Sequence, residues 1–112
     1  MLPKKNRLKK KGDFEKVLRG GDWFRETFLV LKKRENKLKN SRFGFIVSQK
    51  VSKKAVTRNK IKRRLRESVM PLVKKIKSGQ DFAFIALPKT ETKNFLEIDE
   101  VVKKILKKAK VL

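Results

Sequence analysis

The side chains in this sequence that could do chemistry are mostly cations, and they are concentrated in one segment. Nine Lys and Arg residues lie within residues 50–66, and no acid follows before Glu67. On a helix, which turns by about 100° per residue, one arc carries guanidinium, ammonium and amide groups: Arg58, Asn59, Lys62, Arg63 and Arg66. Ile61 and Leu65 lie on the opposite side. Arg binds phosphate through a planar fork, and Asn reaches base edges and 2′-hydroxyls, so the arc predicts a nucleic-acid site.

Two other interpretations of this segment are weaker. Solvated helix faces usually mix Glu with Lys four residues apart for mutual support, whereas Arg58, Lys62 and Arg66 place like charges at that spacing. Each such pair costs roughly a few tenths of a kcal/mol in an isolated helix, a cost that a facing anion would remove. A helix lying on a membrane would turn its apolar stripe to the lipid, but Ile61 and Leu65 are needed for the core. A polyanion is the favoured partner.

The composition excludes several classes of site. The 112 residues include 34 Lys and Arg but 11 Asp and Glu, which gives a formal net charge of +23 at pH 7. Because Cys and His are absent, disulfides, thiolate zinc sites, thiol nucleophiles and histidine bases are excluded. No apolar run approaches the ~20 residues that span a bilayer, and the basic start lacks a signal-peptide core. We expect a single, strongly basic domain over residues 1–112 with a polyanionic partner, in the cytoplasm and not on a membrane.

Apolar periodicity predicts an α+β chain with helices against one sheet. In order, the predicted elements are an extended basic arm (1–12), a helix capped by Asp13 and ended by Gly20-Gly21, a strand (24–33), a strand (42–48), a helix (53–70), a strand (81–87) and a helix capped by Asn94 with Glu97. We expect the first two strands to pair as a hairpin. Pro71 should break the basic helix, Gly79 should take a left-handed conformation, and strand 81–87 should be buried on both faces.

Residues 54–67 read Lys-Ala-Val-Thr-Arg-Asn-Lys-Ile-Lys-Arg-Arg-Leu-Arg-Glu. This segment resembles the signature helix of the bacterial ribonuclease P protein subunit. The motif of that family runs Arg-Asn-Arg-x-Lys-Arg-x-x-Arg. The strand at 42–48 and residues 6–14 also resemble that family, so the similarity covers nearly the whole chain. Lys60 stands where the family usually has its second Arg. The resemblance implies one mixed sheet of three to four strands flanked by helices. It also implies a left-handed β-α-β crossover, where general rules favour a right-handed one.

The same resemblance implies a role. Members of this family bind the catalytic RNA of ribonuclease P and help it to remove the 5′ leader of precursor tRNA. Catalysis belongs to that RNA and its Mg²⁺ ions. For this chain we therefore expect the catalytic RNA and the leader as partners, no further protein, no catalytic residue, and no metal or cofactor bound by the protein alone.

The resemblance assigns contacts with the catalytic RNA to Arg58, Asn59, Lys62, Arg63 and Arg66. Neighbouring cations and those of the arm complete the RNA-binding candidates: Arg7, Lys9, Lys10, Lys50, Lys53, Lys54 and Lys60. The leader-binding candidates are Phe14 and Phe28, because aromatic rings stack on bases, with Leu31 near a position where some relatives carry another aromatic. For each Phe, core packing is the competing interpretation. Trp23, expected in a loop, could pack on the first helix or touch RNA.

Two alternatives stay open. A generic basic ribosomal or nucleoid protein would explain the charge but not the motif spacing. A stand-alone nuclease would need clustered carboxylates or a general base, and its candidate acids are scattered in the sequence: Asp13, Asp22, Asp81 and Asp99. We also predict that Arg58→Ala and Arg63→Ala weaken RNA binding and leave folding unchanged, because neither side chain should belong to the core.

Overall fold

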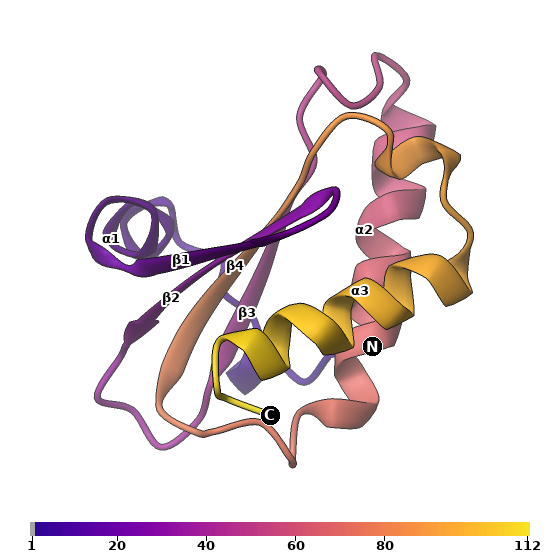
Figure 1. Ribbon diagram of the computed structural model, residues 1–112. Coiled ribbons are helices and arrows are strands. Elements are labelled where there is room, and N and C mark those ends of the chain that lie inside the picture. Colours follow the sequence, from indigo (N-terminus) through magenta and orange to yellow (C-terminus); the bar gives the residue numbers. More distant parts are fainter. Residues whose placement is uncertain (1) are drawn as a thin grey trace.

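The computed structural model describes residues 2–112 and shows one four-stranded sheet with helices on both faces (Figure 1). The helices and strands are α1 (Lys11–Gly20), β1 (Asp22–Glu26), β2 (Leu29–Glu35), β3 (Arg42–Ile46), α2 (Ala55–Val69), β4 (Gln80–Ala86) and α3 (Phe95–Lys108). Three short 3₁₀ helices are η1 (Lys4–Asn6), η2 (Met70–Leu72) and η3 (Thr90–Thr92). The strand order is β1-β2-β4-β3, antiparallel except for the parallel pair β3–β4. The predicted α+β fold with one mixed sheet is confirmed.

The main core lies between the sheet and the two helices α2 and α3. Phe82 and Phe84 of the central strand β4 have no exposed area, and their rings stack on Phe43 and Phe45 of β3 with centroids 5.1 Å and 5.6 Å apart. The buried helix side chains on this face are Ile61, Leu65, Val69, Ile98, Val101, Val102, Ile105 and Leu106. Since strand side chains alternate between faces, residues 81, 83 and 85 of β4 point to the opposite side.

A second, smaller cluster fixes α1 on that opposite side. Leu8, Val17 and Ala83 are buried there, with Phe14 and Leu18 packed against them. A methyl group at Gly44 would collide with the edge of the Phe14 ring and would lie 3.2 Å from Leu8 Cβ. Only glycine at this position lets the ring lie directly on the strand.

The structure divides the predicted strand 24–33 into two. Thr27 has a φ of 48°, in the left-handed region, and the turn at Thr27 and Phe28 folds β1 back onto β2. The predicted hairpin between 24–33 and 42–48 is therefore wrong, since β2 pairs with β4 and β3 pairs with the other edge of β4. The turn lacks the Gly, Pro, Asn and Asp residues that usually mark such positions.

The arm is packed against the sheet, which corrects the prediction of an extended segment over 1–12. Leu2 and Leu8 are buried, and the Leu8 N–H donates to the Phe43 carbonyl at 2.9 Å. The buried Asn6 amide donates to the Ser41 carbonyl at 2.8 Å. Apolar side chains at positions 2 and 8 hold the arm along the edge of β3 despite its cations. Residue 1 lies outside the described residues.

The remaining helices follow the sequence closely. α2 ends at Val69 and passes into η2, as the position of Pro71 predicted. Asn94 and Glu97 form the predicted capping box at the start of α3, with hydrogen bonds of 2.9 Å and 3.1 Å. Gly79 has a φ of 76°. By contrast, α1 begins at Lys11, two residues before the predicted cap at Asp13. α2 joins the parallel neighbours β3 and β4, and the left-handed sense of this crossover stays a prediction.

Candidate nucleic-acid interface

The side of α2 that faces away from the core carries the predicted cations. We call Arg58, Asn59, Lys62, Arg63 and Arg66 the basic arc. Within residues 2–112, the arc makes one contact with an acid, 3.9 Å between Arg63 Nε and Glu67 Oε1, and both side chains are more than half exposed. Exposed pairs of this kind contribute little to stability. The positive charge of the arc is therefore left available for an external anion.

Arg58 has an additional structural role that the sequence did not reveal. Its Nη1 donates to the carbonyls of Ser52 and Lys53, at 3.0 Å and 2.9 Å, and so closes the loop that precedes α2. Replacement by Ala would free two carbonyls at the helix entrance, so we no longer expect Arg58→Ala to leave folding unchanged. Arg63 and Arg66 have no hydrogen bond to the main chain of the described residues, which makes them the better probes of binding.

The flanking cations differ in how they are held. Lys50, Lys53, Lys54 and Lys60 are exposed around the start of α2. Arg64, outside the arc, donates from Nη1 to the Lys93 carbonyl at 2.8 Å and ties α2 to the segment before α3.

The arm cations lie at the edge of β3, and within residues 2–112 no hydrogen bond joins them to the basic arc. Arg7 is half-buried, and its Nε donates to the Leu2 carbonyl at 2.7 Å. Lys9 and Lys10 are exposed just before α1. Arg7 thus helps to fold the arm, whereas Lys9 and Lys10 are free to meet an anion.

A row of four side chains crosses the sheet on the α1 face, one from each strand. The strand register aligns Arg25 with Val30, Val30 with Ile85, and Ile85 with Ile46. The three aliphatic residues are half-buried and belong to neither hydrophobic cluster of residues 2–112. We call this row the open strip. The sequence did not predict this row, because strand 81–87 was expected to be buried on both faces, whereas Ile85 is half-buried.

The neighbouring row explains why α1 leaves the open strip uncovered. In that row Lys32, Ala83 and Gly44 are aligned across β2, β4 and β3. Lys32 Nζ donates to the Leu18 carbonyl of α1 at 2.9 Å, and Phe14 lies over Gly44. α1 therefore sits on this row, and the half-buried Phe14 ring lies beside the open strip, two residues along β3 from Ile46.

The other two leader-binding candidates are not on this surface. Leu31 has no exposed area and belongs to the main core, so the prediction that it contacts a leader is wrong. Phe28 is 9% exposed, packs with the same core and lies 5.7 Å from Lys93 Nζ. Because side chains alternate along β2, Leu29 and Leu31 point to the core face and Val30 points to the α1 face.

The aspartates that a nuclease would need are engaged with cations. Arg42 donates to both carboxylate oxygens of Asp81 at 2.8 Å and 2.7 Å, and to Asp13 at 3.2 Å. The pKa of Arg42 is raised, chiefly by the hydrogen bond to Asp81, although burial alone would lower it. Asp22 lies 3.6 Å from Lys33. Asp13 and Asp81 share one guanidinium, which compensates part of their negative charge and occupies their oxygens, and this leaves them poorly suited to hold a metal.

Asp99 is held in a similar way between α2 and α3. Burial alone would raise the pKa of Asp99, but a 2.6 Å hydrogen bond from Ser68 and a 2.9 Å contact with Lys103 outweigh it and lower the pKa. Across residues 2–112, no group of three or more acidic, His or Cys side chains is arranged to hold a metal ion. None of the described helices is both long enough and apolar enough to cross a membrane.

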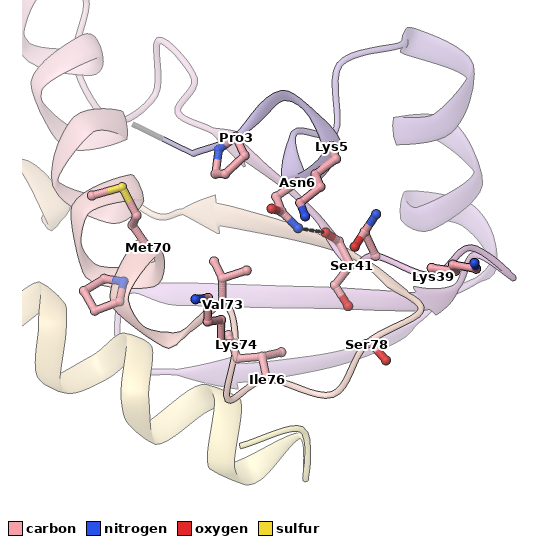
Figure 2. Close-up of a pocket in the computed structure, with 12 residues that line it drawn as sticks. Pro3, Lys5, Asn6, Lys39, Ser41, Met70, Val73, Lys74, Ile76 and Ser78 are labelled. Carbon is pink, nitrogen blue, oxygen red and sulfur yellow. Dashed lines mark hydrogen bonds between the residues drawn. The ribbon is translucent and has the colours of Figure 1, made fainter.

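A hollow of about 660 Å³ lies at the C-terminal end of α2 (Figure 2). The arm forms one wall, the β2–β3 connection another and the segment after α2 the third. Lys5, Lys39 and Lys74 are among its lining residues, and no acid is. The hollow could accept an anionic group, but its lysines are surface residues and nothing in it indicates a particular ligand.

Comparison with known proteins identifies the family. A sequence model of the family described as Ribonuclease P matches residues 2–110. The ribonuclease P protein component of Pseudanabaena sp. is 42% identical over 113 residues, covering 100% of this chain and 97% of that protein. The one from Clostridioides difficile is 38% identical over 105 residues, covering 93% and 91%.

Solved structures agree with the sequence comparison. The RNase P protein of Staphylococcus aureus is similar with a TM-score of 0.87 at 33% identity, over 95% of this chain and 96% of that one. The RNase P protein of Thermotoga maritima has a TM-score of 0.82 at 29% identity, over 91% and 96%. The chain therefore belongs to the ribonuclease P protein family.

Proposed function

We propose that the chain binds the catalytic RNA of ribonuclease P through the basic arc and the 5′ leader of precursor tRNA through the open strip. Membership of the family makes the chain a component of a tRNA-processing ribonucleoprotein with endoribonuclease activity. The finer assignment rests on this chain's own surfaces. The observation that carries it is the basic arc, whose cations are left almost without acidic partners in the described chain.

The basic arc suits a folded RNA backbone. Its guanidinium groups project from a rigid helix that is fixed on the core by Ile61, Leu65 and Val69. Phosphate contacts of this kind give affinity without reading sequence. Asn59, exposed among the cations, can contact a base edge or a ribose hydroxyl.

The open strip suits a single strand instead. A flat row of Val30, Ile85 and Ile46 offers apolar contact to bases, and the Phe14 ring at its side can stack on one of them. Arg25 at the other end can contact a phosphate. A sheet face with aliphatic and aromatic side chains and a cation at its edge resembles the surfaces on which other proteins bind unpaired nucleotides.

We assign the bond-breaking step to the RNA partner, together with the Mg²⁺ ions that it holds. On this chain Asp13 and Asp81 are committed to Arg42, and Asp99 to Ser68 and Lys103. These groups stabilise the fold and are not positioned as a general base. The protein acts by holding the catalytic RNA and the leader of precursor tRNA in fixed positions relative to each other. It does so in the cytoplasm, where tRNA precursors are processed.

The assignment of the basic arc is tested by salt-dependent binding. The double variant Arg63→Ala/Arg66→Ala should weaken binding to the RNA subunit and reduce the slope of log K against log[salt] by about 1.4–1.8, since each phosphate contact contributes roughly 0.7–0.9. The matched control is Lys104→Ala/Lys107→Ala, which removes the same charge from the exposed side of α3. Equal losses in both variants would show that only net charge matters and would contradict a defined arc.

A cleavage assay tests the assignment of catalysis. Precursor tRNA is incubated with the protein alone, with the RNA subunit alone and with both. We expect cleavage only when the RNA is present. Adding the protein should lower the KM for precursor tRNA with a long leader more than the KM for precursor tRNA whose leader is a single nucleotide. Cleavage by the protein alone, lost on replacing one of its aspartates, would instead establish a protein nuclease.

A further inference from the structure

Trp23 is the most unusual exposed side chain on the sheet. It is the single Trp of the sequence, it lies on the edge strand β1, and it is 64% exposed. The sequence suggested a loop, where a large side chain could pack against α1. Instead the residue belongs to a regular strand, paired with Lys32 of β2.

The strand pattern fixes the face on which Trp23 lies. Its neighbour Phe24 packs against the main core, so alternation along β1 places Trp23 on the α1 face. Arg25, two residues on, shares that face and ends the open strip. Trp23 is therefore the next side chain along the sheet edge from the open strip, on the same surface.

Local charges leave the indole ring uncovered. Lys32, directly opposite, directs its ammonium group to the Leu18 carbonyl at 2.9 Å. Lys33 lies 3.6 Å from Asp22. Within residues 2–112, a cation lies over the ring of Phe28, where Lys93 provides it, but none lies over the ring of Trp23. A large aromatic face thus lies open to solvent, bordered by cations that are held beside it.

We propose that Trp23 is a base-stacking platform that extends the open strip to the edge of the sheet and binds one more nucleotide of the single-stranded leader. The proposal rests on the proposed function of the open strip. An aromatic face stacks on any base, and Arg25 between the ring and Val30 can contact the phosphate that joins two nucleotides. With a net charge of +23, the chain favours a polyanion over an acid-poor protein segment as occupant.

The sole Trp provides a direct signal. The full-length protein, with its RNA subunit, is titrated with precursor tRNAs whose leaders increase in length and with mature tRNA. Indole fluorescence should be quenched only by leaders long enough to reach the sheet edge, and mature tRNA should leave it unchanged. Quenching that is independent of leader length, or absent with the longest leader, would overturn the proposal.

Variants separate this inference from the proposed function. Trp23→Ala should weaken binding of the long-leader substrate by about 5- to 150-fold, leave short-leader binding unchanged and retain the circular dichroism of the native chain. Trp23→Phe should keep most of the affinity. Phe14→Ala should weaken both substrates. If Phe14→Ala acts on leader binding and Trp23→Ala does not, the platform is wrong while the open strip stands; if neither acts, the open strip is wrong as well.

Edge strands also pair with other chains, and the same protein samples test that outcome. If Trp23 instead supports self-association through β1, indole emission will depend on protein concentration without RNA, and sedimentation will show a dimer that Trp23→Ala abolishes. That result would overturn the assignment to the leader.

Discussion

Arg42 joins β3 to β4 and α1, and its removal should destabilise the whole α1 face. Replacing Arg42 by Ala leaves the Asp81 carboxylate with one described hydrogen bond, from Asn36 at 2.8 Å. Removing one partner of a buried ion pair costs about 3–5 kcal/mol. The side chains of Arg42 and Asp81 keep 23% and 8% of their exposure, so solvent screens part of this loss. We expect about 2–3 kcal/mol, which corresponds to roughly 10 °C in Tm.

Urea and thermal unfolding, followed by far-UV circular dichroism, measure this change. The matched control is Asp22→Asn, which removes an ion pair whose carboxylate is 76% exposed and should cost less than about 1 kcal/mol. Adding Asp81→Asn to Arg42→Ala should recover part of the stability, because no unpaired charge then stays buried. Equal destabilisation by Arg42→Ala and Asp22→Asn, or a still less stable double variant, would refute the reasoning.

Two further changes test how α1 and α3 are held. Gly44→Ala should displace the Phe14 ring, lower the free energy of unfolding by about 1–3 kcal/mol and weaken binding of leader-bearing substrate. The control is Gly12→Ala, where no atom lies within 4 Å of the new methyl group. This variant should unfold at the native Tm or slightly above. Because the folded-state pKa of Asp99 lies below its unfolded value near 3.8, its charged form contributes stability above that pH, and the contribution is lost as pH falls through the folded pKa. Asp99→Asn should therefore cost about 1 kcal/mol at neutral pH, and the difference from the native chain, measured by urea unfolding, should vanish in stronger acid.

The features that were predicted correctly depend on local sequence. The apolar stripe of α2, the stop at Pro71 and the cap at Asn94 each act within one or two helical turns. β4 was recognised because a nearly continuous apolar run fits a central strand. In each case the residues that determine the element lie within it or beside it.

The features that were missed depend on pairing between distant segments. Nothing around Thr27 marks a turn, yet its left-handed conformation creates β1 and moves β2 next to β4. The open strip exists only because Val30, Ile85 and Ile46 come into register across three strands. Each of these residues, taken alone, has the apolar side chain of a core position, so nothing in the sequence marks it as exposed.

The chain itself connects the two candidate RNA surfaces. The open strip ends at Ile46, and residues 47–54 lead from there to the first turn of α2. Lys50, Lys53 and Lys54 are exposed along this connection, so cations continue from the strip to the basic arc. α2 packs on the sheet face opposite to the open strip, so the two proposed RNA surfaces lie on opposite sides of the sheet, and this cationic connection is the segment of chain that joins them.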